Sequence, residues 1–129
     1  MTTGSDFGKL LLRLMVGCLM LFHGIAKVNG GISFIINKVT QEGFPEFLAY
    51  GVYIGEVIAP ILLIIGLQTR FAGFIIVLTM SFAIYLVHAG DLFAITQTGA
   101  WAIELQMIYL LSALAIMFLG AGKIAFDKD

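Results

Sequence analysis

Charged residues are scarce in this chain of 129 residues, where Asp, Glu, Lys and Arg together make up 12% and hydrophobic residues 60%. Soluble globular domains carry about twice that charged fraction. A soluble protein this short has too high a ratio of surface to volume to hide so much apolar surface from water. Lipid removes the problem, so we predict an integral membrane protein. The net charge of −1 gives no sign of a nucleic-acid partner.

Cysteine is nearly absent as well, since Cys18 is the only one, and no internal disulfide can form. The sequence also lacks a CxxC pair, a phosphate-binding glycine loop, a nucleophile elbow and any cluster with metal-ligand spacing, so no metal site is predicted. Residues 15–18 resemble a lipoprotein cleavage site. Arg13, however, leaves only a short apolar run before the cysteine, and we do not expect a cleaved leader.

Four apolar stretches approach the roughly 20 residues that a helix needs to cross a bilayer core of about 30 Å. They cover residues 10–26, 47–66, 71–87 and 101–119. Backbone groups must be hydrogen-bonded within the segment in lipid, so helices are the default. We therefore predict an all-α, membrane-spanning four-helix bundle that forms a single domain over residues 1–129.

The segment between the first two stretches is long, interrupted by glycines, and ends in Phe44-Pro45. Its residues 32–41 are rich in apolar side chains. We predict a short helix there, lying at the membrane interface or tucked into the mouth of the bundle. A plain ordered loop is the alternative.

Basic residues predict the orientation, because cytoplasmic loops of membrane proteins carry an excess of Lys and Arg. Two of them, Lys27 and Lys38, fall on one side of the predicted bundle. The other side holds both termini and more basic residues, namely Lys9, Arg13, Arg70, Lys123 and Lys128. Both termini are therefore predicted to be cytoplasmic.

One acidic residue, Glu56, lies deep in the second apolar stretch. It is about nine residues from the start of that stretch, or roughly 14 Å at 1.5 Å per residue. An ionisable group in hydrocarbon costs about 2.5–3.5 kcal/mol on insertion scales, so Glu56 must be protonated or paired. His23 is the predicted partner, because an imidazole can hold or pass a proton near neutral pH. Glu56 and His23 are the predicted catalytic residues.

Further polar side chains are expected to converge with these two in the outer half of the bundle. The whole expected set is His23, Lys27, Glu56, Tyr85, His88, Asp91 and Glu104. The predicted substrate-binding residues are Lys27, Arg13, Glu104, Tyr85 and His88.

Each of these residues also has a plainer interpretation. Lys27 could extend to the outer interface, and Arg13 could extend to the inner headgroups instead of turning inward to meet a carboxylate. His88 and Glu104 could simply be solvated.

Two backbone features accompany the deep carboxylate. Pro60 follows Glu56 by four residues, and its ring removes the helical hydrogen bond to the carbonyl of residue 56. That carbonyl would be free for a ligand or a neighbour, unless the kink serves packing alone. Gly51 and Gly55 form a small-xxx-small pair, which is typical of helix packing in lipid.

Several segments, taken in order, resemble the DoxX family of small bacterial integral membrane proteins, and the resemblance covers nearly the whole chain. The segments that carry it are Leu12-Arg13-Leu14, residues 21–27 (LFHGIAK), Gly55-Glu56, residues 66–70 (GLQTR), Glu104, residues 120–123 (GAGK) and Asp127.

The resemblance implies a four-helix membrane bundle in a bacterial inner membrane. It also draws attention to Arg13, His23, Lys27, Glu56 and Glu104. The family takes its name from a subunit of a thiosulfate:quinone oxidoreductase, and other relatives are linked to membrane redox complexes.

The leading hypothesis is therefore a non-autonomous subunit of a quinone-linked oxidoreductase, with a quinone or small-molecule pocket in the outer half of the bundle. Glu56 and His23 would hold or move protons there, and Lys27 would attract an anionic or electron-rich group. The chain carries no cofactor motif of its own, and a quinone is the candidate ligand. The expected partners are the lipid bilayer and a protein of a redox complex, with a homo-oligomer left open. The alternatives are a small proton-coupled transporter and a structural membrane anchor for a partner enzyme.

Overall fold

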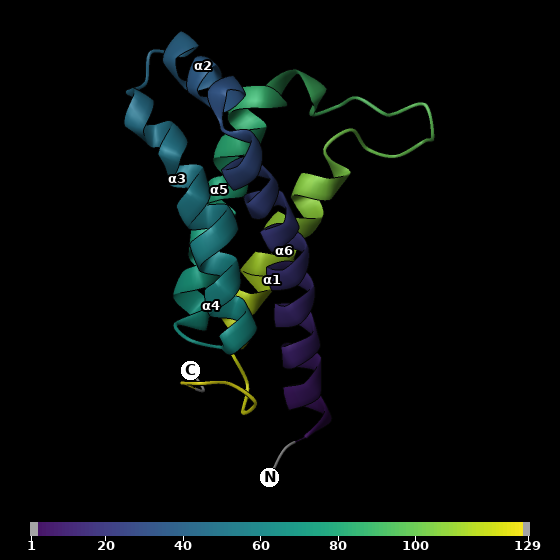
Figure 1. Ribbon diagram of the computed structural model, residues 1–129. Helices are drawn as coiled ribbons and strands as arrows, with labels where there is room; N and C mark the ends of the chain where they lie inside the picture. The colour runs from purple at the N-terminus through teal and green to yellow at the C-terminus, as the bar shows by residue number, and fades with distance from the viewer. Residues whose placement is uncertain (1–2, 128–129) are drawn as a thin grey trace.

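The computed structural model describes residues 3–127, and the regular elements in that range are all helical (Figure 1). In chain order they are α1 (Gly4–Gly30), α2 (Ser33–Gln41), a segmented helix over Glu46–Ile65, α5 (Thr69–Val87) and α6 (Glu104–Leu119). A short 3₁₀ turn, η3 (Ala89–Asp91), follows α5. The prediction of an all-α protein is confirmed for this part of the chain.

Three of these helices are long and apolar enough to cross a membrane: Gly4–Gly30, Glu46–Ile65 and Thr69–Val87. The fourth apolar helix, α6, has 16 residues and is shorter than the other three. Large apolar side chains cover the outside of the molecule, and Leu11, Phe22 and Phe118 are each at least 69% exposed. An apolar exterior of this kind belongs in lipid, so the chain is a membrane protein.

Helix α1 begins at Gly4, six residues before the predicted start at residue 10. The reason is a capping box, in which the Thr3 hydroxyl accepts from the Asp6 N–H and the Asp6 carboxylate accepts from the Thr3 N–H. Such a box holds a helix start made of polar residues, which an apolar run does not reveal. At the other end, Gly31 has a φ of +81°, a conformation that glycine adopts without strain.

The helix over Glu46–Ile65 is built from four pieces and is not regular. It starts as a 3₁₀ turn, η1 (Glu46–Tyr50), and continues as α3 (Gly51–Tyr53). A π-helical turn, η2 (Ile54–Ile58), follows and leads into α4 (Ala59–Ile65). The predicted span of 47–66 is therefore right in extent, whereas its internal geometry differs from a plain α-helix.

The long helices pack closely where glycine allows it. A Cβ atom at Gly17 would lie 2.9 Å from the Pro60 carbonyl oxygen, and one at Gly24 would overlap the Glu56 carbonyl, so α1 packs directly on the segmented helix. Gly73 brings α5 equally close to α6. The core between these helices consists of Val16, Met20, Ala59, Leu63, Ala72, Ile76, Met80, Tyr109, Ala113 and Ile116.

The predicted Gly51–Gly55 pair does not act as one packing surface. A Cβ atom at Gly51 would meet nothing within 4 Å, whereas one at Gly55 would overlap the Thr79 side chain of α5. The contact between α1 and the segmented helix uses Gly17 and Gly24 on α1 instead.

Helix α2 confirms the predicted short helix at 32–41. It packs against η1 and α5 over a second apolar cluster of Ile32, Val39, Ala49 and Val52. It lies at the end of the molecule opposite the two termini, and so does the loop that leads into α6 (Figure 1). This end corresponds to the predicted mouth of the bundle.

Candidate functional site

Glu56 lies inside the π-helical turn, and Pro60 accounts for the turn. The Ala59 N–H donates to the Ile54 carbonyl, five residues back, and Pro60 has no N–H to continue an ordinary α-helical pattern. A π-turn inserts one extra residue and often marks a functional site. The Glu56 carbonyl faces Gly24 on the neighbouring helix. Of the two predicted uses of this carbonyl, contact with a neighbour is the one observed.

The Glu56 carboxylate is buried, with 4% of the residue exposed, and it forms an ion pair with Lys27. Lys27 Nζ donates to Glu56 Oε1 over 2.5 Å. The prediction that His23 is the partner is wrong, and so is the alternative in which Lys27 extends to the outer interface. Lys27 follows the buried residues Met20 and Gly24 by seven and three positions on α1, so it continues their stripe, and its side chain, 30% exposed, turns toward Glu56. A charged carboxylate at this depth is stabilised by the opposite charge.

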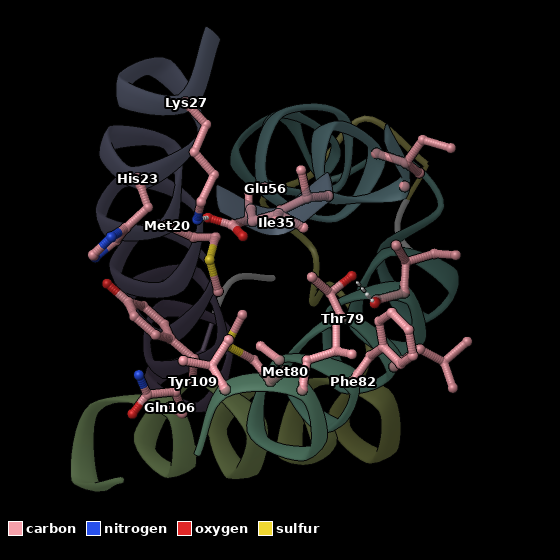
Figure 2. A pocket seen from close by; sticks show the side chains of 18 of the residues that line it. Met20, His23, Lys27, Ile35, Glu56, Thr79, Met80, Phe82, Gln106 and Tyr109 are labelled. Atoms are coloured by element: carbon pink, nitrogen blue, oxygen red, sulfur yellow. Dashed lines mark hydrogen bonds and ion pairs between the residues drawn. The ribbon is translucent and has the colours of Figure 1, made fainter. Parts of the chain in front are cut away.

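The ion pair lines a cavity of about 590 Å³ between the helices (Figure 2). The cavity lies in the half of the molecule away from the termini, and most of its wall is apolar. Its polar lining residues are His23, Lys27, Glu56, Thr79, His88, Gln106 and Tyr109. Apolar side chains complete the wall, among them Met20, Ile35, Ile54, Ile75, Leu78, Met80, Phe82 and Leu105.

Three polar lining residues were missed by the sequence reasoning: Thr79, Gln106 and Tyr109. Tyr109 is buried and belongs to the core stripe of α6 with Ala113 and Ile116. Gln106 precedes Tyr109 by three residues, so both side chains lie on the same helix face. This spacing was a readable signal, because a polar residue and a tyrosine continue the stripe that the buried residues define.

The two histidines lie at one end of the cavity. The His23 ring meets the Tyr109 ring edge to face, with centroids 5.8 Å apart, and the hydroxyl end of Tyr109 points toward His23 (Figure 2). His88 lies between two partners, with Nδ1 3.3 Å from an Asp91 carboxylate oxygen and Nε2 3.3 Å from the Gln106 amide nitrogen. His88 thus links Asp91, in the turn after α5, to Gln106 on α6.

Three predicted substrate-binding residues, Tyr85, Glu104 and Arg13, lie outside the cavity wall. Tyr85 is 54% exposed and packs its ring near Phe44 and Phe82. Glu104 is exposed at the first turn of α6. The structure therefore does not bring Tyr85 or Glu104 to the ion pair, although His88, which was predicted with them, does line the cavity.

Arg13 is buried in a different place, about 21 Å along α1 from Lys27 at 1.5 Å per residue. Its guanidinium donates to the carbonyls of Leu63 and Ile64 at the end of α4. It also donates to the carbonyls of Ala121 and Ile124 in the C-terminal segment. Arg13 turns inward, as one alternative predicted, and there it ties three parts of the chain together away from the cavity.

No group of three or more His, Cys, Asp or Glu side chains within residues 3–127 is arranged to hold a metal ion. The formal charges on the cavity wall are those of Lys27 and Glu56, which cancel. The wall thus combines a neutral charge balance and a few hydrogen-bonding groups with a mainly apolar lining. Such a site suits an amphipathic small molecule.

Comparison with known proteins finds one family model and relatives of similar length. The family model described as DoxX matches residues 8–89. An uncharacterized protein of Haemophilus influenzae is 36% identical over 123 residues, which cover 91% of this chain and 86% of the relative. A second uncharacterized protein of that organism is 30% identical, covering 96% of this chain and 83% of the relative.

A further relative, from Bacillus subtilis, is named "Putative oxidoreductase CatD". It is 29% identical over 127 residues, which cover 98% of this chain and 90% of the relative. No solved structure matches the chain.

Proposed function

Because the chain belongs to the DoxX family of membrane proteins, we propose that it is a membrane subunit of a redox system and that its cavity binds a quinone. The observation that carries the proposal is the buried Lys27–Glu56 pair in the wall of a largely apolar cavity between membrane helices. The oxidoreductase name of the Bacillus subtilis relative supports the redox part. The electrons would be exchanged with a partner enzyme in the same membrane.

The lining residues fit a quinone in both parts of its structure. Apolar side chains such as Met80 and Phe82 match a hydrocarbon ring and tail, whereas quinone oxygens need hydrogen-bond donors. Lys27 has three N–H donors, of which Glu56 Oε1 takes one, and the Tyr109 hydroxyl offers another. When bound, a quinone would supply two-electron, two-proton chemistry. Within this chain, the pair of Lys27 and Glu56 would hold a proton in a site shielded from water.

The proposal includes four membrane crossings by one domain, with both termini in the cytoplasm of a bacterial inner membrane. Helix α6 is about 24 Å long at 1.5 Å per residue, and a short helix can be matched by local thinning of the bilayer. The Lys123 N–H donates to the Asp6 carboxylate at the start of α1. This bond joins the C-terminal segment to the start of α1, which supports a return of the chain to its starting side by a fourth crossing. A redox enzyme is the proposed partner, with self-association an open second mode.

Replacing Glu56 by Gln tests the quinone site. We expect the wild-type protein, purified in detergent, to retain extractable quinone, and Glu56→Gln to retain about tenfold less. The reason is that Gln no longer holds the Lys27 ammonium in place by a charge-assisted hydrogen bond, so the bond that Lys27 would donate to a quinone oxygen is lost, at a cost of about 1.5 kcal/mol or roughly a factor of ten in binding. The measurement is the molar ratio of quinone to protein by mass spectrometry after solvent extraction.

The matched control is Glu42→Gln, which removes an exposed carboxylate that does not line the cavity and should leave the ratio unchanged. A wild-type protein without quinone, or equal ratios in both variants, would argue against the proposal. Proton flux through sealed vesicles in the absence of any quinone would favour the transporter instead. Stable co-purification with an enzyme, without quinone, would favour the structural anchor.

A further inference from the structure

The Tyr109 side chain carries a polar group of the cavity wall that has no hydrogen-bond partner in the described part of the protein. Tyr109 is 6% exposed and lines the cavity, and its hydroxyl forms no hydrogen bond with any other residue of the described chain, 3–127. Within residues 3–127, the fully buried side-chain polar atom that lacks a partner is Thr69 Oγ1, so the Tyr109 hydroxyl oxygen remains accessible from the cavity and can donate to a molecule bound there. The hydroxyl end of Tyr109 points toward His23 at the polar end of the cavity (Figure 2).

The charge on the cavity wall limits what kind of molecule could satisfy this hydroxyl. The positive charge of Lys27 is already balanced by Glu56 at 2.5 Å. An anion would have to compete with that carboxylate for the ammonium, and it would lose its own hydration on entering. A neutral acceptor oxygen needs no counter-charge. The ion pair thus removes the basis for expecting Lys27 to attract an anion.

The apolar part of the wall suggests the route by which such a molecule arrives. Ile54 and Leu78 line the cavity and are also 48% and 51% exposed, so they form part of its rim. On a membrane protein this apolar rim faces lipid. A ligand with a hydrocarbon part can therefore enter from the bilayer and reach the polar end with its head group.

We propose that the Tyr109 hydroxyl donates a hydrogen bond to a neutral carbonyl or hydroxyl oxygen of a lipid-soluble ligand, and that the paired charges of Lys27 and Glu56 select against anionic ligands. The inference rests on the proposed function, since it concerns the same cavity. It adds the residue that anchors the head group and the charge class of the ligand. It places the anchoring hydrogen bond on α6 and the charge selection on α1 and η2.

Two probes of matched shape test both parts: 9,10-anthraquinone, which is neutral, and anthraquinone-2-sulfonate, which is anionic. Anthraquinone does not add to thiols, so the exposed Cys18 does not interfere. Binding is measured by equilibrium dialysis against the full-length protein in one detergent. We expect Tyr109→Phe to weaken anthraquinone binding about three- to tenfold, as the loss of one hydrogen bond predicts. The phenyl ring keeps the edge-to-face contact with His23.

Tyr50→Phe is the matched control, because Tyr50 is exposed and lies outside the cavity wall, and it should bind anthraquinone as the wild type does. Glu56→Gln leaves the Lys27 charge unbalanced, so it should raise sulfonate binding relative to anthraquinone binding. Thermal unfolding of each variant shows whether its fold is intact.

The outcomes distinguish a failure of this inference, in its anchoring part or its charge-selection part, from a failure of the proposed quinone site. If the wild type binds anthraquinone and Tyr109→Phe binds it equally well, the anchoring role of Tyr109 is wrong. If Glu56→Gln leaves the ratio of sulfonate to anthraquinone binding unchanged, the charge selection is wrong. A wild type that binds neither probe would overturn the quinone site itself, and this inference with it.

Discussion

At the scale of single residues, the pairing of Glu56 with Lys27 instead of His23 shows what helical spacing can and cannot predict. His23 and Lys27 are four residues apart and share a broad face, and both line the cavity. Gly24 sits against the Glu56 carbonyl, so the residues three positions apart, 24 and 27, define the contact stripe. Position 23 lies to one side of it. The long lysine side chain then reaches a carboxylate that a short imidazole does not.

Removing the lysine alone should destabilise the protein. Lys27→Met leaves Glu56 buried without its counter-charge, and breaking a buried pair costs about 3–5 kcal/mol. We expect the lower end, about 3 kcal/mol, because the Lys27 side chain is 30% exposed and water already screens part of the pair. Denaturant unfolding in a fixed detergent measures the change in the free energy of unfolding.

The double variant Lys27→Met, Glu56→Gln is the control for this prediction. With neither charge present, nothing is left buried and uncompensated, so stability should recover to within about 1 kcal/mol of the wild type. If Lys27→Met is as stable as the wild type, then the ion pair contributes nothing to the fold.

At the scale of elements, the π-turn over Ile54–Ile58 and the glycines of α1 form one arrangement. Pro60 prevents a regular α-helical pattern, and the turn exposes the Glu56 carbonyl toward α1. Gly24 leaves room for that carbonyl because it has no side chain. The depth at which Glu56 lies and the approach of Lys27 both depend on this contact between backbones.

Adding a methyl group at Gly24 should therefore disturb the site. Gly24→Ala places a Cβ atom in overlap with the Glu56 carbonyl carbon and oxygen, and overpacking of this kind costs about 1–3 kcal/mol. Gly51→Ala is the matched control, because nothing lies within 4 Å of its Cβ position. It should be neutral or stabilising by up to about 1 kcal/mol, since alanine favours a helix over glycine. Thermal unfolding in detergent compares the two, and equal melting temperatures would refute the close contact.

The sequence predicts the existence of the helices better than their edges or inner geometry. Long apolar runs identify 47–66 and 71–87 closely, because hydrophobicity decides where a chain can cross lipid. The start of α1 depends on the Thr3–Asp6 capping box, and the start of α6 at Glu104 depends on the loop before it. Neither the capping box nor this loop gives a clear change in hydrophobicity along the sequence. Pro60 signals a departure from the α-helix, yet the π-turn arises only with the packing of α1.

The candidate site is predictable in part for a similar reason. The cost of a charge in lipid singles out Glu56 and directs attention to nearby bases. The same argument does not identify Tyr109 or Gln106, because these side chains carry no charge and continue the apolar stripe of α6. Arg13 looks like a member of the same set by charge alone. Its hydrogen bonds to backbone carbonyls of α4 and the C-terminal segment follow only from the tertiary fold.

At the scale of the whole molecule, the two ends of the chain are held together. Arg13 donates to the carbonyls of Ala121 and Ile124, and the Lys123 N–H donates to Asp6. The Asp127 carboxylate accepts from the Gln68 N–H in the loop between α4 and α5. The start of α1, this loop and residues 121–127 therefore lie at the same end of the molecule, as the proposed four crossings require.

That geometry makes the proposed orientation testable by labelling two positions. In a Cys18→Ser background, Thr98→Cys places a thiol in the loop before α6, and Phe126→Cys places one in the C-terminal segment, where Phe126 is 76% exposed. The side of the termini holds three basic residues, Lys9, Arg70 and Lys123. The other side holds two, Lys38 and the paired Lys27. The excess of basic residues predicts that the terminal side is cytoplasmic.

A membrane-impermeant maleimide added to intact cells with a permeable outer membrane should then label Thr98→Cys and spare Phe126→Cys. After the inner membrane is permeabilised, both should react, which shows that each thiol is accessible. The reverse pattern would invert the orientation and move the cavity to the cytoplasmic half. Labelling of both positions in intact cells would mean three crossings. The bond between Lys123 and Asp6 could not then form, because its partners would lie on opposite faces of the bilayer.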